Sequence, residues 1–578
     1  MKFSQSPVLE LRLPVWRARL VLALFGAAFL VLLGRAAYLQ AMNEDFLQAK
    51  GESRYARVLE VPATRGKILD RNGEALAIST PVKAVWAIPA DVKATAKQLQ
   101  ELAVLLGLSR DELQKRLASQ RDFVYLKRQL EPAVAEQVAA LRIPGIHLSR
   151  EYRRYYPAGE VMAHVLGFTN ADDVGQEGIE LAFESHLAGV PGSRRVIKDR
   201  RGHIVEDAGS ITAARDGKDL VLALDSRIQS LAYGQLREAV RQHRAKGGAV
   251  VVIDVRTGEV LALANLPSYN PNNRAGLTGA QLRNRAVTDM FEPGSTLKPI
   301  TVALALERGK VTPKTAIDIA PGSLTIGPNT IRDSHYDKEK SVLTVAEVIQ
   351  RSSNVGSAKI ALEMPPAAMY EMFEEIGFGS PPRLGFPGEA AGRVRPYKSW
   401  KPIEQATMSY GHGITVSLIQ LARAYTVFAR DGELMPLSLL KVDTPPEGKR
   451  VLSPQTAQAV RQMLELAVQP GGTAPRAQIM GYRVAGKTGT AHKLVDGRYA
   501  RDKYVSSFVG FAPASDPRLV VAVMIDEPSA GQYYGGQVAA PVFAQVMAGS
   551  LRTLGVQPDA PMEPIKLPPP GAEIRESI

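Results

Sequence analysis

One segment near the start of the sequence restricts the fold more than any other. Residues 20–34, LVLALFGAAFLVLLG, contain no charged residue. A spanning helix needs roughly 20 apolar residues, so the run reaches that length only if Arg35 extends toward the interface and residues 36–39 continue the helix. The alternatives are a cleaved signal peptide, for which the following residues offer a poor cleavage site, or a buried core helix. We expect an uncleaved transmembrane anchor at residues 20–40.

The flanking charges predict the orientation of this anchor. Basic residues precede it at positions 2, 12, 17 and 19, whereas the basic residues after it are mixed with acidic ones. Trp16 and Tyr38 are suited to the two interfaces. We therefore expect residues 1–19 in the cytoplasm and everything after residue 40 in the periplasm, outside the inner membrane.

The composition of the chain excludes several kinds of site and partner. A chain of 578 residues is long enough for two or three domains. It contains no cysteine, which excludes disulfides, thiolate metal sites and cysteine nucleophiles. Its net charge of +13 is compatible with an anionic polymer, a membrane surface or nucleic acid. Because the basic residues are scattered among acidic ones and no nucleic-acid-binding motif is present, we expect no nucleic acid partner.

The chain divides into two large regions after the anchor. Residues 41–215 contain a predicted hairpin turn at residues 71–74 and helices between residues 95 and 143, with breaks at Gly107 and Pro132. This first region has no obvious reactive cluster, and we interpret it as a structural or interaction module.

The second region, residues 216–556, begins with a strand and a helix capped by Asp225 or Ser226. A predicted hairpin follows at residues 247–265, and three further strands and a helix lie far downstream. Strands at both ends of a helical middle predict one antiparallel sheet flanked by helices, an α+β fold. The proline-rich tail, residues 557–578, is predicted to be flexible.

A candidate nucleophile lies in the segment FEPGSTLKPI, residues 291–300. Ser295 follows a Pro-Gly turn, and Lys298 comes three positions later, on the same face of a helix. Taken alone, the segment is explained by an amphipathic helix with Ser295 as its N-cap. S-x-x-K is common by chance, so a catalytic interpretation needs partners elsewhere.

Two further motifs supply those partners. They are SSN at residues 352–354 and KTGT at residues 487–490. Each alone is compatible with a helix cap or a β-turn. The three motifs in this order and at domain-scale spacing resemble those of the penicillin-binding proteins, the active-site-serine peptidoglycan transpeptidases.

Other segments narrow the resemblance. Residues 65–73 resemble the first motif of the class B, single-anchor type, which has no glycosyltransferase domain. FEPGSTLKP together with YGHG at residues 410–413 is most similar to the division-specific, septal member, because the elongation member usually has a different residue where Glu292 stands. The resemblance implies an elongated mixed N-terminal module followed by a penicillin-recognising transpeptidase domain.

The resemblance also implies catalytic roles that agree with elementary chemistry. Ser295 needs an adjacent base, and Lys298 can serve if burial and a second cation, Lys487, lower its pKa. Ser352 would relay the proton to the leaving amine, and Asn354 would hold Lys298 and a substrate amide. Lys487 would also attract the terminal carboxylate of a peptide.

The same motifs imply how substrate binds. Residues of the KTGT strand can pair with an extended peptide, and backbone amides of Ser295 and Thr490 would form the oxyanion hole. The implied substrate-binding residues are Ser353, Thr488, Gly489, Thr490 and Tyr410.

The implied reaction is acyl transfer without metal or cofactor. Ser295 would attack a D-alanyl-D-alanine bond of a peptidoglycan stem peptide, release D-alanine, and pass the acyl group to an amine of a neighbouring stem. β-Lactam antibiotics would acylate the same serine. The resemblance further implies the division septum as the location, and a polytopic lipid-II glycosyltransferase and other division proteins as partners.

Several alternatives stay open at this point. A D,D-carboxypeptidase or β-lactamase would use the same site, although the anchor and large first region argue against a small secreted lactamase. A non-catalytic septal scaffold is disfavoured by the intact Ser295, Lys298 and Lys487. A penicillin-sensing receptor would need a signalling module, and none is evident. A specialised paralogue of the division enzyme is compatible with every motif.

Two histidines are unusual for such a site. The resemblance places His412, in YGHG, and His492, after KTGT, near the active-site groove, where relatives often carry non-titrating or arginine residues. Because histidine changes charge near neutral pH, one hypothesis is that the protein acylates better in mild acid than division enzymes that lack these histidines. The alternative is that both are ordinary residues of the groove wall.

Overall fold

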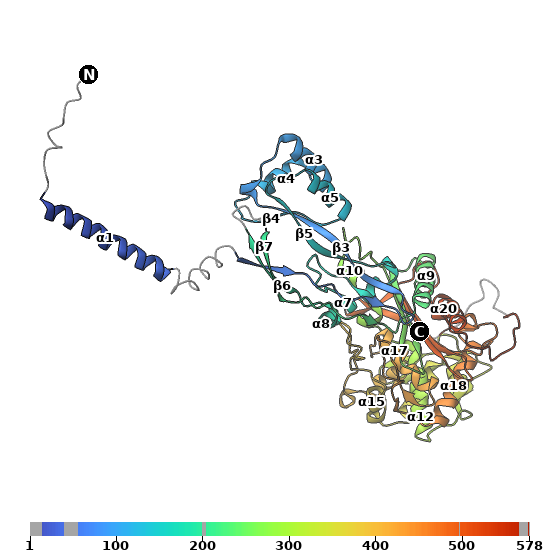
Figure 1. Cartoon of the computed structure of the whole chain (residues 1–578). Helices are drawn as coiled ribbons and strands as arrows, with labels where there is room; N and C mark the ends of the chain where they lie inside the picture. Colours follow the sequence, from blue (N-terminus) through green and yellow to red (C-terminus); the bar gives the residue numbers. More distant parts are fainter. Residues whose placement is uncertain (1–13, 40–55, 199–203, 496, 566–575, 577–578) are drawn as a thin grey trace. The chain divides into compact units, whose positions relative to one another are not determined.

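The computed structural model describes residues 14–39, 56–198, 204–495, 497–565 and 576 (Figure 1). The chain forms two compact units. One unit comprises Met1–Ala63 and Gly189–Asp216, and the other comprises Thr64–Ala188 and Gly217–Ile578.

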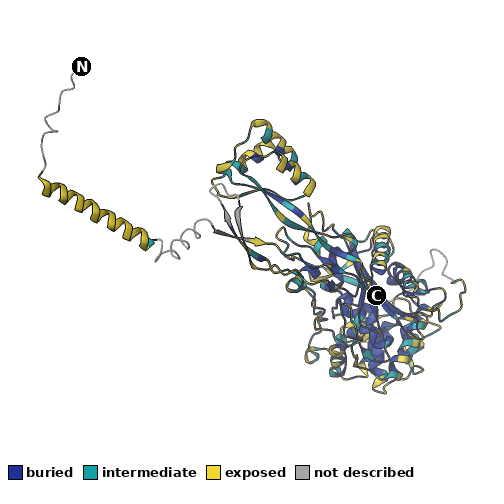
Figure 2. Cartoon of the chain, viewed as in Figure 1, coloured by how far each residue is buried: buried dark blue, intermediate teal, exposed yellow. Residues whose placement is uncertain are grey.

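The first unit contains the predicted anchor helix and a small sheet. Helix α1 (Val15–Ala37) has 23 residues, an 18-residue window of it has a mean hydropathy of 2.2, and its side chains are exposed (Figure 2). By length and composition it can cross a membrane, and it is the one helix in the described ranges that can. Residue 40 of the predicted segment lies outside the described residues. Strands β1 (Ala56–Val61), β6 (Gly192–Lys198) and β7 (Ile204–Thr212) form an antiparallel sheet in the order β1-β6-β7.

The second unit begins with a mixed sheet. The hairpin predicted at residues 71–74 joins β2 to β3, with Ile68 paired to Ala77. The strands of this sheet are β2 (Ile68–Leu69), β3 (Ala75–Ala87), β4 (Val124–Leu130), β5 (Ile146–Tyr155) and β8 (Leu220–Val221). Only the short pairing of β2 with β8 is parallel.

Three helices pack at one end of the long strand β3, as Figure 1 shows. They are α3 (Ala96–Leu106), α4 (Arg110–Leu117) and α5 (Pro132–Ala140). The two predicted breaks are confirmed: Gly107 ends α3 with a φ of 62°, and Pro132 begins α5. The sequence interpretation missed β4, because VYLKRQL carries two basic residues and its strand character depends on pairing with β3.

A five-stranded antiparallel sheet in the order β10-β9-β19-β18-β17 forms the centre of the catalytic region, as the sequence predicted. Its strands are β9 (Gly247–Asp254), β10 (Val260–Leu266), β17 (Ala485–Val495), β18 (Arg498–Ala512) and β19 (Leu519–Asp526). Residues of β9, β10 and β19 are buried throughout, which is typical of a sheet covered on both faces (Figure 2). Strand β17 lies at one edge of the order.

Helices cover both faces of this sheet. On one face α9 (Ser226–Gln242) and α20 (Ala540–Thr553) pack around Phe508 and Phe543. On the other face α17 (Leu418–Ala429) contributes Tyr425 and Phe428 to the largest apolar core. The remaining longer helices are α12 (Lys298–Glu307), α13 (Val345–Arg351), α14 (Asn354–Leu362), α15 (Pro366–Glu375), α16 (Pro402–Met408) and α18 (Pro454–Val468). The molecule is therefore α+β, with the helical middle inserted between strands β10 and β17.

Short elements complete the second unit. The short helices are η3 (Pro89–Asp91), η4 (Gly159–Val161), α6 (Ala163–Leu166), α7 (Gly178–Ala182), α8 (Glu184–Leu187), α10 (Gly279–Leu282), α11 (Arg285–Thr288), η5 (Gly294–Leu297), η6 (Tyr397–Ser399), η7 (Pro475–Ala477) and α19 (Gly535–Val538). The short strands pair as β11 (Ala316–Asp318) with β14 (Val342–Thr344), β12 (Ser323–Ile326) with β13 (Asn329–Arg332), and β15 (Glu433–Leu434) with β16 (Lys449–Arg450).

Most of the predicted flexible tail, residues 557–578, lies outside the described residues. Within its described part, Asp559 accepts hydrogen bonds from the Arg483 backbone N–H at 2.7 Å and from the Ser515 hydroxyl at 2.6 Å. Glu576 is also described, and its carboxylate lies in the catalytic region.

Candidate active site

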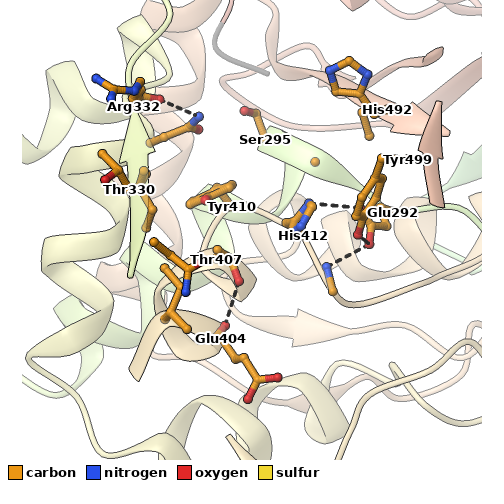
Figure 3. A pocket seen from close by; sticks show the side chains of 18 of the residues that line it. Glu292, Ser295, Thr330, Arg332, Glu404, Thr407, Tyr410, His412, His492 and Tyr499 are labelled. Carbon is orange, nitrogen blue, oxygen red and sulfur yellow. Dashed lines mark hydrogen bonds and ion pairs between the residues drawn. The ribbon is translucent and has the colours of Figure 1, made fainter. Parts of the chain in front are cut away.

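A groove of about 750 Å³ opens beside the edge strand β17 (Figure 3). Its walls come from segments far apart in the sequence, including η5, β13, α14, the YGHG loop and the β17–β18 hairpin. Ser295, Asn354, Tyr410, His412 and His492 all line it. The groove therefore brings together Ser295 of the first motif and Asn354 of the second, and Ala491 and His492, which follow the KTGT motif, line its wall.

Ser295 lies in the short 3-10 turn η5, directly before α12. The prediction that Ser295 is the helix N-cap is wrong, because α12 begins at Lys298, with Pro299 in its first turn. Gly294 has a φ of 57°, and a Cβ added to Gly411 would lie 2.3 Å from the Gly294 carbonyl oxygen. The YGHG loop thus packs directly on the backbone that presents Ser295, which is only 5% exposed.

Lys298 is completely buried and contacts the second motif. Its ammonium nitrogen donates hydrogen bonds to the Ser352 backbone oxygen and, at 3.0 Å, to Ser352 Oγ. Burial and then the charge of Lys487 hold the pKa of Lys298 well below its usual value. Both causes were expected from the sequence. A lysine with a lowered pKa reaches its neutral form more easily, and the neutral amine can accept a proton from a hydroxyl.

The SSN motif joins two helices. Ser352 ends α13 in a left-handed conformation with a φ of 61°, and Ser353 is the N-cap of α14, accepting from the Gly356 N–H at 2.9 Å. The Asn354 side-chain amide donates to the Arg332 backbone oxygen at 3.3 Å. These contacts attach the motif to the end of β13.

Asp333 is a residue of this site that the sequence interpretation missed. Its carboxylate accepts from Ser353 Oγ and the Asn354 N–H, both at 2.6 Å, and from the Val355 N–H at 3.0 Å. It therefore adds a charged cap to α14 from a loop outside the motif. An isolated aspartate after a short hairpin carries no signal that would have identified it.

The KTGT motif occupies the buried part of β17. Lys487 is completely buried, and its ammonium nitrogen lies 3.2 Å from Thr488 Oγ1, to which it donates. Burial lowers the pKa of Lys487 to about 8, although the nearby Glu576 charge opposes this shift. Thr488 also shares a hydrogen bond of 2.9 Å with Thr473.

Gly489 permits a close approach between β17 and the backbone before Ser295. A Cβ added there would lie 2.5 Å from Ser507 Oγ and 2.7 Å from the Pro293 carbonyl oxygen. A side chain would therefore push η5 away from β17, rather than only obstruct a peptide. Thr490 accepts at Oγ1 from the Gly535 N–H at 2.9 Å, which fixes the orientation of its hydroxyl.

Glu292 joins the residues at the end of the groove where His412 and Tyr499 lie (Figure 3). It accepts hydrogen bonds from Tyr499 OH at 2.8 Å and the Gly413 N–H at 2.9 Å, and it lies 3.3 Å from His412 Nδ1. Burial opposes ionisation, but these partners, led by His412, lower the pKa of Glu292 overall. The His412 and Tyr499 rings are stacked, with centroids 4.8 Å apart.

Both histidines line the groove, as expected. His492 Nδ1 lies 3.0 Å from the Ala500 carbonyl oxygen, and its ring packs against Tyr504 with centroids 4.8 Å apart. Tyr410 lies on the Lys298 side, with its ring centroid 5.9 Å from the lysine nitrogen.

Two family models match the chain. Residues 248–548 match a model described as the penicillin binding protein transpeptidase domain. Residues 60–222 match a model described as the penicillin-binding protein dimerisation domain. The two matched ranges do not overlap, and residues 223–247 lie between them.

Curated relatives match along nearly the whole chain. The chain is 46% identical to the probable peptidoglycan D,D-transpeptidase PenA of Neisseria gonorrhoeae, over 94% of each sequence. It is 44% identical to the peptidoglycan D,D-transpeptidase FtsI of Escherichia coli, over 94% of this chain and 93% of the relative. Among solved structures, the transpeptidase domain of Burkholderia pseudomallei penicillin-binding protein 3 is 50% identical, with a TM-score of 0.54 over 59% of this chain and 98% of that one.

Proposed function

Because the chain belongs to the penicillin-binding protein family and is a peptidoglycan D,D-transpeptidase, we propose that Ser295 is the serine that its substrates and β-lactams acylate. The observation that carries this assignment is the buried Lys298, on the turn after Ser295 and in contact with Ser352. We also propose that the KTGT strand binds the donor peptide.

Acylation follows from these positions. Ser295 Oγ attacks the carbonyl carbon between the two D-alanine residues while the neutral Lys298 amine accepts the hydroxyl proton. The carbonyl electrons move to the oxygen, which accepts from the backbone N–H groups of Ser295 and Thr490. When the tetrahedral intermediate collapses, the proton passes from Lys298 through Ser352 to the leaving nitrogen, and D-alanine departs.

The second half-reaction reverses the roles. An amine of a neighbouring stem peptide attacks the acyl carbon, its proton returns to Ser295 Oγ, and a new peptide bond cross-links the two stems. The substrate-binding residues proposed for this cycle are Ser353, Asn354, Tyr410, Thr488, Gly489 and Thr490, together with Lys487 for the donor carboxylate.

The proposal extends to domains, location and partners. We propose an N-terminal non-catalytic domain at residues 41–215 and a transpeptidase domain at residues 216–556, which the two matched ranges support. Helix α1 would hold the enzyme in the inner membrane, with the catalytic domain in the periplasm at the division septum. A polytopic lipid-II glycosyltransferase and other division proteins would be its partners, and a specialised paralogue of the division enzyme is the alternative role. Labelling intact cells with fluorescent penicillin, with and without Ser295, tests the septal location.

Mass spectrometry of the penicillin-treated protein tests the nucleophile. We expect a penicilloyl adduct on Ser295 that persists for many minutes, and no adduct in Ser295→Ala at an unchanged melting temperature. An adduct elsewhere in Ser295→Ala would refute the assignment. Rapid loss of the wild-type adduct would instead favour a hydrolase, such as a carboxypeptidase or β-lactamase using the same site.

A further inference from the structure

A carboxylate of the chain itself lies inside the candidate active site. Glu576 is only 1% exposed, although it belongs to the far end of the sequence given. Its Oε2 accepts a hydrogen bond of 2.8 Å from Thr490 Oγ1, and its Oε1 accepts one of 2.6 Å from the Gly536 N–H. One oxygen is thus bound by the KTGT strand and the other by the start of α19.

The neighbours of Glu576 compensate in part for its burial. A buried charge is unfavourable unless hydrogen bonds and an opposite charge compensate for lost hydration. Burial raises the pKa of Glu576, and a backbone N–H, a hydroxyl and the charge of Lys487 oppose that shift. The interaction is mutual, because the Glu576 charge raises the pKa of both Lys487 and Lys298 against the effect of burial.

The partners of Glu576 are the groups that the reaction requires for its donor. In the proposed function, on which this inference rests, the terminal carboxylate of the donor peptide binds beside Lys487 on the KTGT strand. Thr490 Oγ1 has one proton to donate, and it donates that proton to Glu576. Glu576 and a donor carboxylate therefore compete for the same hydroxyl.

We propose that Glu576 is an intramolecular ligand of the donor-carboxylate subsite, so that the chain restrains its own transpeptidase until this carboxylate is displaced. Among the described residues, Glu576 binds the Thr490 hydroxyl and the Gly536 N–H, and its side chain offers no scissile bond. Donor peptides and β-lactams, whose carboxylates need the same partners, would bind only to the fraction of enzyme in which Glu576 has left.

The expected size of the effect follows from competition. The apparent dissociation constant of a ligand equals its intrinsic value divided by the fraction of protein that can bind it. If Glu576 occupies the subsite in nine-tenths of the molecules, penicillin therefore binds about tenfold more weakly. The limiting acylation rate at saturating penicillin should not change, because the acylating complex no longer contains bound Glu576. Competition thus changes how the acylation rate depends on penicillin concentration, and it leaves the rate of the chemical step unchanged.

Stopped-flow acylation of the full chain in detergent by a fluorescent penicillin tests the proposal. We expect Glu576→Gln and Glu576→Ala to raise the second-order acylation rate about five- to tenfold, without changing the limiting rate. The increase in Glu576→Ala should be at least as large as that in Glu576→Gln. Glu573→Gln removes the same charge three positions earlier and should behave as wild type.

The outcomes separate this inference from the proposed function. If both Glu576 variants acylate at the wild-type rate or more slowly, or if Glu573→Gln accelerates equally, the carboxylate is not a competitor in the subsite. A structural role alone would lower the melting temperature and the rate together. If instead no variant and no wild-type protein forms a Ser295 adduct, the proposed function fails, whatever Glu576 does.

Discussion

The ammonium nitrogen of Lys298 lies 3.0 Å from Ser352 Oγ, and both residues are buried. The two belong to different motifs, and their contact links α12, which follows the turn that holds Ser295, to the end of α13. Because burial and Lys487 lower the pKa of Lys298, the contact joins a base to a hydroxyl that can carry its proton onward. Four predictions concern Lys298 and the residues around the groove.

Lys298→Ala should slow acylation by penicillin by roughly 10²- to 10⁴-fold, the usual contribution of a positioned base. The matched control is Lys310→Ala, an exposed lysine just after α12, which should acylate at the wild-type rate. Stopped-flow kinetics and a thermal melt of each variant give the rate and the fold. A near-wild-type rate in Lys298→Ala would exclude this lysine as the base.

The pH profile of acylation should have two limbs set by two lysines. Lys298 must be neutral, so the rate falls as pH drops through its lowered pKa. Lys487 must be charged to attract a carboxylate, so the rate also falls as pH rises through about 8. Lys487→Arg keeps a positive charge at alkaline pH, and its alkaline limb should move upward by at least one pH unit. Second-order rates from pH 5 to pH 10 measure both limbs, and an alkaline limb shared by wild type and Lys487→Arg would contradict this role for Lys487.

Asp333→Asn should weaken the cap of α14 and displace the SSN motif. Losing the charge that accepts from Ser353, Asn354 and Val355 should reduce stability by about 1–2 kcal/mol. Because the Asp333 charge raises the pKa of Lys298, its removal should also move the acid limb of the acylation profile to lower pH. Asp337→Asn, at an exposed position, is the control. A purely structural role would reduce the rate equally at every pH.

The sequence predicted what depends on local pattern. The strands of the central sheet are continuous apolar runs, and the three motifs are short enough to recognise directly, so the α+β fold and the place of Ser295, Asn354 and Tyr410 in the groove follow from them. Three contributors could not be predicted, because they act through contacts distant in sequence. Asp333 contacts the SSN motif from the loop after a hairpin, Glu292 joins two loops, and Glu576 lies 86 positions after its partner Thr490. The strand β4 was missed for the same reason, because its partner and not its periodicity determines its conformation.

The pairing of His412 with Glu292 should make acylation depend on mild acid. The lowered pKa of Glu292 keeps it ionised from pH 5 to pH 8, so a comparison of wild type with a histidine variant separates the histidine from the two limbs set by Lys298 and Lys487. Protonated His412 would form an ion pair with Glu292 that holds the YGHG loop against the turn carrying Ser295. The ring of His412 also stacks on that of Tyr499. We expect the ratio of wild-type to His412→Tyr rates to grow several-fold between pH 8 and pH 5, and to stay constant when both are compared in a Glu292→Gln background. His492→Arg supplies a permanent charge across the groove and tests whether the second histidine contributes. A wild-type profile that neither histidine substitution alters would refute the idea.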